Sequence, residues 1–129
     1  MAAEGSAARI LVADDFVENT RILENFLKPK GYEVVSVHDG AAAVRVAEEN
    51  PPDIILLDLV MPKMDGVEVC HHLKQNPTTR HIPVIIITGM PEKQANVRAL
   101  EAGADDFLAK PFDAVLLDAR IRSSLRSKQ

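Results

Sequence analysis

Four short apolar runs in this chain each end in a polar or charged residue. The runs and the residues that follow them are 10–13 with Asp14 and Asp15, 54–57 with Asp58, 84–87 with Thr88, and 107–109 with Lys110. The first three runs lack the polar alternation of a half-exposed strand, so both of their faces should be covered, as in a parallel sheet. Because a buried charge is costly without a partner, polar groups at all of these ends indicate one shared site.

Helical segments alternate with the strand-like segments along the chain. Strands are predicted at 9–13, 33–38, 53–57, 83–87 and 106–109, and helices at 18–28, 41–49, 66–74, 92–102 and 113–126. The segment 33–38 alternates apolar and polar residues, which predicts an outer strand. The apolar face of the first helix should consist of Ile22, Leu23, Phe26 and Leu27. This alternation predicts a doubly wound α/β domain with right-handed crossovers around a five-stranded parallel sheet.

The composition argues against several classes of protein. The 129 residues suffice for one domain, and no apolar run approaches the roughly 20 residues that cross a bilayer. The net charge of -4 and the few aromatic residues (four Phe, one Tyr, no Trp) argue against a nucleic-acid-binding surface. One cysteine, Cys70, and an N-terminus without signal-peptide features favour a cytoplasmic protein. We expect a disordered segment at 1–8, a domain at 9–126, and a tail or linker start at 127–129.

The residues at the strand ends suit phosphoryl chemistry that a metal ion assists. Ligands of open parallel α/β sheets bind beyond the carboxyl ends of the strands. The carboxylates of Asp14, Asp15 and Asp58 would repel one another there, and oxygen ligands without His or Cys indicate Mg²⁺ between them. Lys110 would add a positive charge and Thr88 a hydroxyl donor for a phosphoryl group. An aspartate can itself act as the nucleophile and carry that group as an acyl phosphate.

Several motifs taken together resemble the receiver domain of two-component response regulators. They are 10–15, Asp58 with 61–66, Thr88-Gly89, and 101–107 leading into Lys110-Pro111-Phe112. The resemblance covers about residues 9–126 and implies a flavodoxin-like (βα)5 fold with strand order 2-1-3-4-5. It also implies a signalling switch rather than an enzyme that turns over a substrate. Such a domain takes a phosphoryl group from a sensor histidine kinase or phosphotransfer protein in a reaction that needs Mg²⁺. The domain itself assists this phosphoryl transfer and its later dephosphorylation.

The resemblance assigns roles to the acidic residues. Asp58 is the expected phosphoacceptor. Asp15 and Asp58 are expected to bind Mg²⁺ directly and Asp14 through water, with the backbone carbonyl of Val60 as a further ligand.

The resemblance also assigns roles to residues on the last two strands. Thr88 is expected to hydrogen-bond the phosphoryl group, and Lys110 to pair first with Asp58 and then with phosphate. Phe107 is expected to turn inward when Thr88 moves, and the Lys110–Pro111 peptide bond is expected to be cis.

The chain departs from the family pattern at three places. Phe107 has no hydroxyl, where some receivers have tyrosine, so its inward burial should need no hydrogen-bond partner. Val60 and Met90, two residues after Asp58 and Thr88, are apolar and cannot position a hydrolytic water with their side chains. We therefore expect a long-lived phosphoryl group.

Other functions compete with this interpretation. An aspartate-dependent phosphohydrolase would need an acid where Val60 stands, and a flavodoxin-like cofactor site would need hydroxyl and amide groups at 14–18. A receiver fold kept only as a binding module would need a disabled site, and nothing in the sequence disables it.

The same resemblance bears on the downstream partner and on self-association. The expected downstream partner is an attached output domain or a separate protein, and we expect no membrane and no direct nucleic-acid contact by this domain. Asp106 and Arg120 would pair across a homodimer face formed by the fourth helix, fifth strand and fifth helix, or with each other in one chain. An exposed ion pair of the second kind is worth roughly 0–1 kcal/mol.

Overall fold

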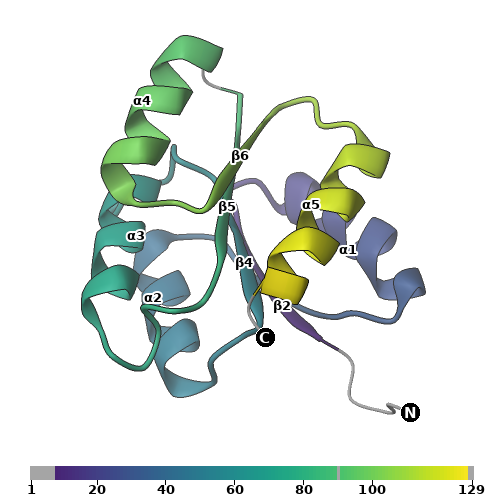
Figure 1. The fold of residues 1–129 in the computed structure, drawn as a ribbon, viewed down its shortest axis with the longest axis horizontal. Helices are drawn as coiled ribbons and strands as arrows, with labels where there is room; N and C mark the ends of the chain where they lie inside the picture. The colour runs from purple at the N-terminus through teal and green to yellow at the C-terminus, as the bar shows by residue number, and fades with distance from the viewer. Residues whose placement is uncertain (1–7, 90, 128–129) are drawn as a thin grey trace.

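Five parallel strands form the sheet at the centre of the molecule (Figure 1). The computed structural model describes residues 8–89 and 91–127. The strands are β2 (Arg9–Ala13), β3 (Glu33–Val37), β4 (Ile54–Leu57), β5 (Val84–Thr88) and β6 (Asp106–Ala109). Their order across the sheet is β3-β2-β4-β5-β6, and each neighbouring pair is parallel. Counted along the chain, this is the predicted order 2-1-3-4-5, with β3 at an edge as its alternating pattern indicated.

Helices cover both faces of this sheet (Figure 1). One face carries α1 (Val17–Leu27) and α5 (Ala114–Ser127), and a short 3₁₀ turn, Lys28–Lys30, follows α1. The other face carries α2 (Gly40–Glu49), α3 (Gly66–Gln75) and α4 (Glu92–Ala102). The predicted doubly wound α/β architecture is therefore confirmed.

Each strand supplies side chains to two hydrophobic cores, because successive residues of a strand point to opposite faces. In β2, Ile10 and Val12 pack with α1 and α5, whereas Leu11 and Ala13 pack with the helices of the other face. The central strands β4 and β5 are buried along their whole length. The two cores fix the ends of neighbouring strands relative to one another, and the polar residues follow at those ends.

Three helices, α1, α2 and α5, begin one residue away from the predicted position, and an aspartate caps the last two of them. The Asp39 side chain accepts a hydrogen bond from the Ala42 amide at 2.8 Å, so α2 begins at Gly40. The Asp113 side chain accepts one from the Val115 amide at 2.8 Å, so Asp113 precedes α5 instead of opening it.

The predicted apolar face of α1 is only partly buried. Leu23 and Leu27 belong to the core, but Ile22 is 55% exposed. Successive helical residues are separated by about 100° around the axis. The contact with the sheet therefore holds Leu23 and Leu27 and leaves Ile22 at its margin.

The ends of the domain differ slightly from the expectation. The Ala8 carbonyl accepts a hydrogen bond from the Glu33 amide at 2.9 Å, so residue 8, which was expected to be disordered, is tied to the edge strand. The helix α5 continues to Ser127, one residue past the expected end. The rest of the expected N-terminal segment, 1–7, and residues 128–129 lie outside the described residues.

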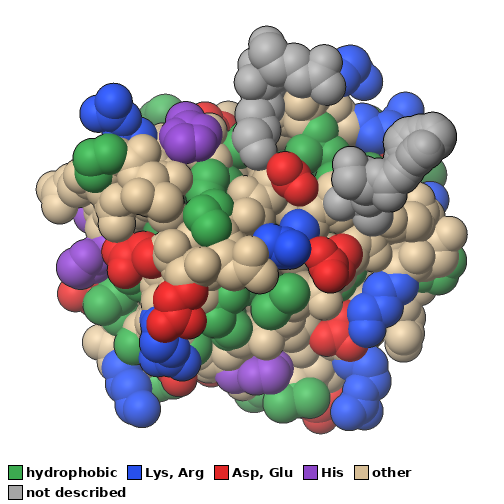
Figure 2. All heavy atoms as spheres, turned by 90° about the horizontal axis from the view of Figure 1, so that it is seen from below, with side chains coloured by type: hydrophobic (Ala, Val, Ile, Leu, Met, Phe, Trp, Pro, Cys, Tyr) green, Lys and Arg blue, Asp and Glu red, His purple; other side chains and the backbone are tan. Residues whose placement is uncertain are grey.

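Charged residues of both signs are distributed over the surface. Figure 2 shows basic and acidic side chains interspersed on one face of the molecule. This distribution agrees with the modest net charge of -4. Within residues 8–89 and 91–127, the helices lack the length and apolar character needed to span a bilayer.

Candidate functional site

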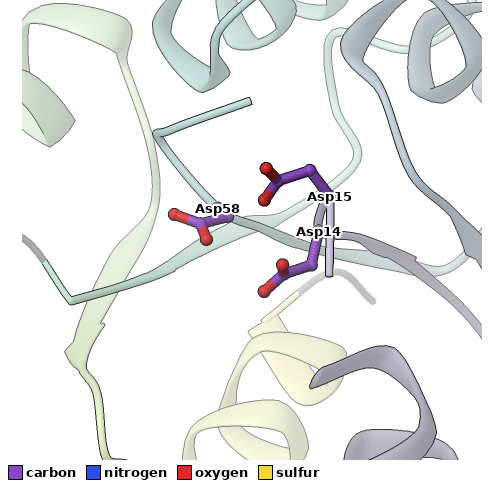
Figure 3. Close-up of side chains that lie close together, drawn as sticks. All are labelled: Asp14, Asp15 and Asp58. Atoms are coloured by element: carbon purple, nitrogen blue, oxygen red, sulfur yellow. The ribbon is translucent and has the colours of Figure 1, made fainter. Parts of the chain in front are cut away.

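The carboxyl groups of Asp14, Asp15 and Asp58 lie together at the carboxyl ends of β2 and β4 (Figure 3). An oxygen from each of the three lies within 4.8 Å of an oxygen from the others. The sheet register explains this proximity, because Ala13 and Leu57, which precede Asp14 and Asp58, are partners across the two strands. Asp14 and Asp58 are buried, whereas Asp15 is half-buried. The structure thus brings these residues together as the sequence predicted.

Lys110, which follows β6, reaches two of the three carboxylates. Its Nζ lies 2.9 Å from Asp58 Oδ2 and 2.7 Å from Asp14 Oδ2. Partial burial by itself lowers the pKa of Lys110, but the hydrogen bonds and negative charges of Asp14 and Asp58 outweigh it, and the pKa lies above its usual value. The ammonium is therefore charged and offsets part of the acidic cluster. The Lys110–Pro111 peptide bond is cis, as expected.

Asn19 belongs to the site although the sequence argument did not single it out. Its Nδ2 lies 3.3 Å from Asp14 Oδ1 and 3.2 Å from Asp14 Oδ2. A signal was present, because Asn19 stands four residues before the buried Leu23 and so on the side of α1 that faces the sheet. A polar residue on that side of the helix needs a polar partner, and the nearest strand end supplies Asp14.

The loop after Asp58 is held against the strand ends by backbone contacts. The Val60 amide donates to Asp58 Oδ1 at 3.2 Å, and the Gly66 amide donates to the Leu59 carbonyl at 2.8 Å. A Cβ atom on Gly66 would lie 2.4 Å from the Asp58 carbonyl oxygen, so only glycine lets α3 begin this close to the site. Asp65 and Glu68 form a capping box at the same helix start.

Asp15 is the least compensated of the three acids. Its carboxylate has no hydrogen-bond or ion-pair partner among residues 8–89 and 91–127. Asp14, in contrast, accepts hydrogen bonds on both oxygens, from Lys110, Asn19 and the Phe16 amide. An all-oxygen set with one uncompensated carboxylate fits a hard divalent cation such as Mg²⁺.

The two residues expected to act as the switch lie on neighbouring strands. Thr88 is buried at the end of β5, and its carbonyl accepts a hydrogen bond from the Lys110 amide at 2.8 Å. Phe107 on β6 is half-buried and packs against the core beneath α2, α3 and α4. Phe107 also lines a small cavity that lies between α4, β6 and α5.

Asp106 and Arg120 pair with each other within one chain. Arg120 Nη1 lies 2.8 and 2.9 Å from the two carboxylate oxygens of Asp106. The intramolecular arrangement left open by the sequence is therefore present in the structure.

A cavity of about 560 Å³ borders the acidic cluster. At one end it is lined by Asp14, Asn19, Asp58 and Lys110, and elsewhere mostly by apolar side chains of the strands, α1 and the segment after β6. Asp58, although buried, thus lies at one end of this cavity.

A doubly wound parallel sheet with carboxylates and a lysine at the carboxyl edge defines a ligand-binding α/β domain. Residues 10–122 match the family model of the response regulator receiver domain. The chain belongs to this family.

Individual relatives agree with the family assignment. The chain is 52% identical over 122 residues to the response regulator PleD of Caulobacter vibrioides. The matched segment covers 95% of this chain and 27% of PleD. A crystal structure of a putative response regulator from Chloroflexus aurantiacus superposes with a TM-score of 0.90 at 32% identity, covering 94% of this chain and 99% of that one. The receiver domain of a Pseudomonas aeruginosa sensor histidine kinase, which contains a magnesium ion coordinated in its active-site cleft, superposes with a TM-score of 0.87 at 32% identity, covering 93% and 98%. The chain spans between about a quarter and a half of the length of the curated relatives that it matches.

Proposed function

We propose that this receiver domain is a phosphoacceptor switch in which Asp58 takes a phosphoryl group from a phosphohistidine of a partner protein. The observation that supports the assignment is the contact of 2.9 Å between Lys110 Nζ and Asp58 Oδ2 beside the three clustered carboxylates. A cation already at the acceptor oxygen is placed to contact a phosphoryl oxygen once that group arrives. The 560 Å³ cavity bordered by Asp58 supports access of the donor.

The proposed transfer is a displacement at phosphorus. One carboxylate oxygen of Asp58 attacks the phosphorus atom, an O–P bond forms, and the N–P bond to the donor histidine breaks with its electron pair returning to the imidazole nitrogen. The signal ends by hydrolysis, in which a water oxygen attacks phosphorus and one proton of that water passes to solvent. The O–P bond to Asp58 then breaks, which restores the carboxylate and releases inorganic phosphate.

The residues of the site fit a magnesium ion. Asp15, Asp58 and the Val60 backbone carbonyl would hold it, and Asp14, which already accepts hydrogen bonds from Lys110, Asn19 and the Phe16 amide, would act through water. When bound, the ion supplies positive charge that offsets the charge on the transferring oxygens. The magnesium ion in the related Pseudomonas receiver domain supports this assignment.

Thr88 and Phe107 would carry the signal away from Asp58. The Thr88 hydroxyl would bond the phosphoryl group, and Phe107, which has no hydroxyl to satisfy, would turn further into the core. The face of α4, β6 and α5 would then change its shape toward a downstream partner, either an output domain or a separate protein. A homodimer through this face would have to compete with the Asp106–Arg120 pair that each chain makes internally.

The upstream partner would be a sensor histidine kinase or a phosphotransfer protein, and the domain would act in the cytoplasm. We do not assign it a turnover activity beyond its own phosphorylation and dephosphorylation. An apolar Val60, which is 58% exposed, argues against the aspartate-dependent phosphohydrolase, since that enzyme needs an acid at this position.

The test is labelling of the purified protein by a small phosphodonor, acetyl phosphate or phosphoramidate, followed by intact-mass measurement. The wild type should gain one phosphoryl group in the presence of Mg²⁺ and none in chelator. Asp58→Asn should stay unlabelled, whereas Asp118→Asn, a change on α5 beside Arg122, should be labelled like the wild type. Labelling of Asp58→Asn at the wild-type rate, or an unlabelled wild type with Mg²⁺ present, would refute the proposal.

A further inference from the structure

The negative charge of the buried Asp14 carboxylate is stabilised by a small set of hydrogen-bond donors. It is 3% exposed, so water has little access to it. The Phe16 amide donates to Oδ1 at 2.9 Å, Lys110 donates to Oδ2 at 2.7 Å, and Asn19 lies within 3.3 Å of both oxygens. A buried carboxylate that loses a donor without a replacement is costly.

One of these donors is shared with the phosphoacceptor. Lys110 Nζ lies between Asp14 Oδ2 and Asp58 Oδ2, at 2.7 and 2.9 Å. A phosphoryl group on Asp58 would raise the charge there from −1 to about −1.5 to −2 and carry it away from the sheet. The ammonium, on its flexible stem, should then follow the larger charge and leave Asp14 Oδ2.

Among residues 8–89 and 91–127, Asn19 is the other side chain that donates a hydrogen bond to Asp14 Oδ2. The amide nitrogen carries two hydrogens, and its position near both carboxylate oxygens lets it serve either one. Asn19 lies on α1, which the core anchors through Leu23 and Leu27, so its position does not depend on Lys110.

We propose that Asn19 is a positioning residue that holds Asp14 in place and compensates its charge when Lys110 turns to the phosphoryl group. This inference rests on the proposed function of the site. Asn19 then has a role that differs between the two states of the domain. In the unphosphorylated state Lys110, Asn19 and the Phe16 amide all donate to Asp14. In the phosphorylated state Asn19 and the Phe16 amide remain as the donors. A purely structural role in α1 would affect both states alike.

The test compares magnesium affinity in the two states by isothermal titration calorimetry, with beryllofluoride as the mimic of the phosphoryl group. Asn19→Leu keeps the approximate size of the side chain and removes the donor, and Asn19→Ala serves as a second truncation if the leucine variant folds poorly. Asn19→Gln restores an amide. Arg21→Ala is the matched control, because Arg21 is exposed on the same helix.

Asn19→Leu should weaken Mg²⁺ binding to the beryllofluoride complex by about tenfold, because the Asp14 carboxylate is no longer held in position for the ion. The factor corresponds to the loss of one hydrogen bond to a charged group. Its effect on the free protein should be several times smaller, and Asn19→Gln and Arg21→Ala should stay near the wild type in both states. Equal losses in the two states, or no loss with beryllofluoride, would overturn the inference. Phosphodonor labelling of the wild type separates this outcome from failure of the proposed function, which would appear as a wild type that takes up no phosphoryl group.

Discussion

Lys110 bridges Asp14 and Asp58, with its Nζ 2.7 Å from one carboxylate and 2.9 Å from the other. A single ammonium thus serves two largely buried acids, while Asp15 has no such partner in the part of the chain that the structure describes. The cluster keeps a surplus of negative charge even with Lys110 in place. That surplus should draw a cation into the cluster. A phosphoryl group on Asp58 should then attract both the cation and Lys110, and this change in contacts should alter the state of the domain.

Replacing Lys110 by methionine should lower the free energy of unfolding by about 1–3 kcal/mol without Mg²⁺, because two buried carboxylates lose their shared donor. Urea unfolding in the presence of a chelator measures this loss of stability, and the loss should be smaller when Mg²⁺ is present. Lys28→Met is the control, since the Lys28 ammonium makes a surface pair with Glu24 at 3.8 Å, which should contribute less than about 1 kcal/mol. Similar losses for the two variants would argue against the bridging role.

Asp15→Asn should raise stability in the absence of metal and remove the stabilisation that Mg²⁺ provides. The substitution deletes an uncompensated charge next to two others, and relief of that repulsion is worth about 1 kcal/mol. The wild type, in contrast, should gain about 2.7 kcal/mol at a Mg²⁺ concentration of about 100 times the dissociation constant. Thermal unfolding with and without Mg²⁺ measures both effects. An Asp15→Asn protein that responds to Mg²⁺ like the wild type would show that Asp15 is no ligand.

The fold was largely predictable because its signals are local. The strands β4 and β5 are unbroken apolar runs, and their burial on both faces follows from that pattern. The carboxyl ends of parallel strands share one edge, so the meeting of Asp14, Asp15 and Asp58 followed from their positions in the sequence.

The remaining features depend on how α1 is rotated against the sheet. Packing of Leu23 and Leu27 sets that rotation, and as a consequence Ile22 is exposed and Asn19 contacts Asp14. The contact of Lys110 with Asp14 depends in the same way on the reach of a long side chain. Tertiary packing decides such contacts, and a residue pattern alone does not contain them.

Gly66→Ala should destabilise the protein by about 1–3 kcal/mol through overpacking and should also slow phosphorylation. The new methyl group would meet the Asp58 carbonyl oxygen at 2.4 Å and Leu59 Cα at 2.7 Å, so the loop that carries the acceptor would have to move. Gly89→Ala is the matched control, because a Cβ there has nothing within 4 Å. Urea unfolding and phosphodonor labelling of both variants test this, and equal behaviour of the two would contradict it.

Cys70 should resist alkylation in the native state. Burial raises the pKa of its thiol from 9.0 to about 11, so the protonated form is favoured by folding. The stabilisation that comes from this raised thiol pKa is complete below pH 9 and is lost as the pH rises toward 11. Iodoacetamide at a pH of about 8.5 should therefore label the protein slowly unless urea is present, and Cys70→Ala should show a flatter loss of stability over the same pH range. Native labelling as fast as that of the unfolded chain would contradict the assignment of Cys70 to the core.

The phosphoryl group on Asp58 should persist for many minutes. Val60, two residues after Asp58, is 58% exposed and offers no hydrogen bond from its side chain to a hydrolytic water. Met90, the other apolar residue behind this expectation, lies outside the described residues. Val60→Asn adds a group that can bind such a water and should shorten the lifetime severalfold, whereas Val60→Ile keeps an apolar side chain and should leave it unchanged. Loss of phosphate from the three purified, labelled proteins gives the lifetimes, and decay of the wild type within seconds would show that another group positions the water.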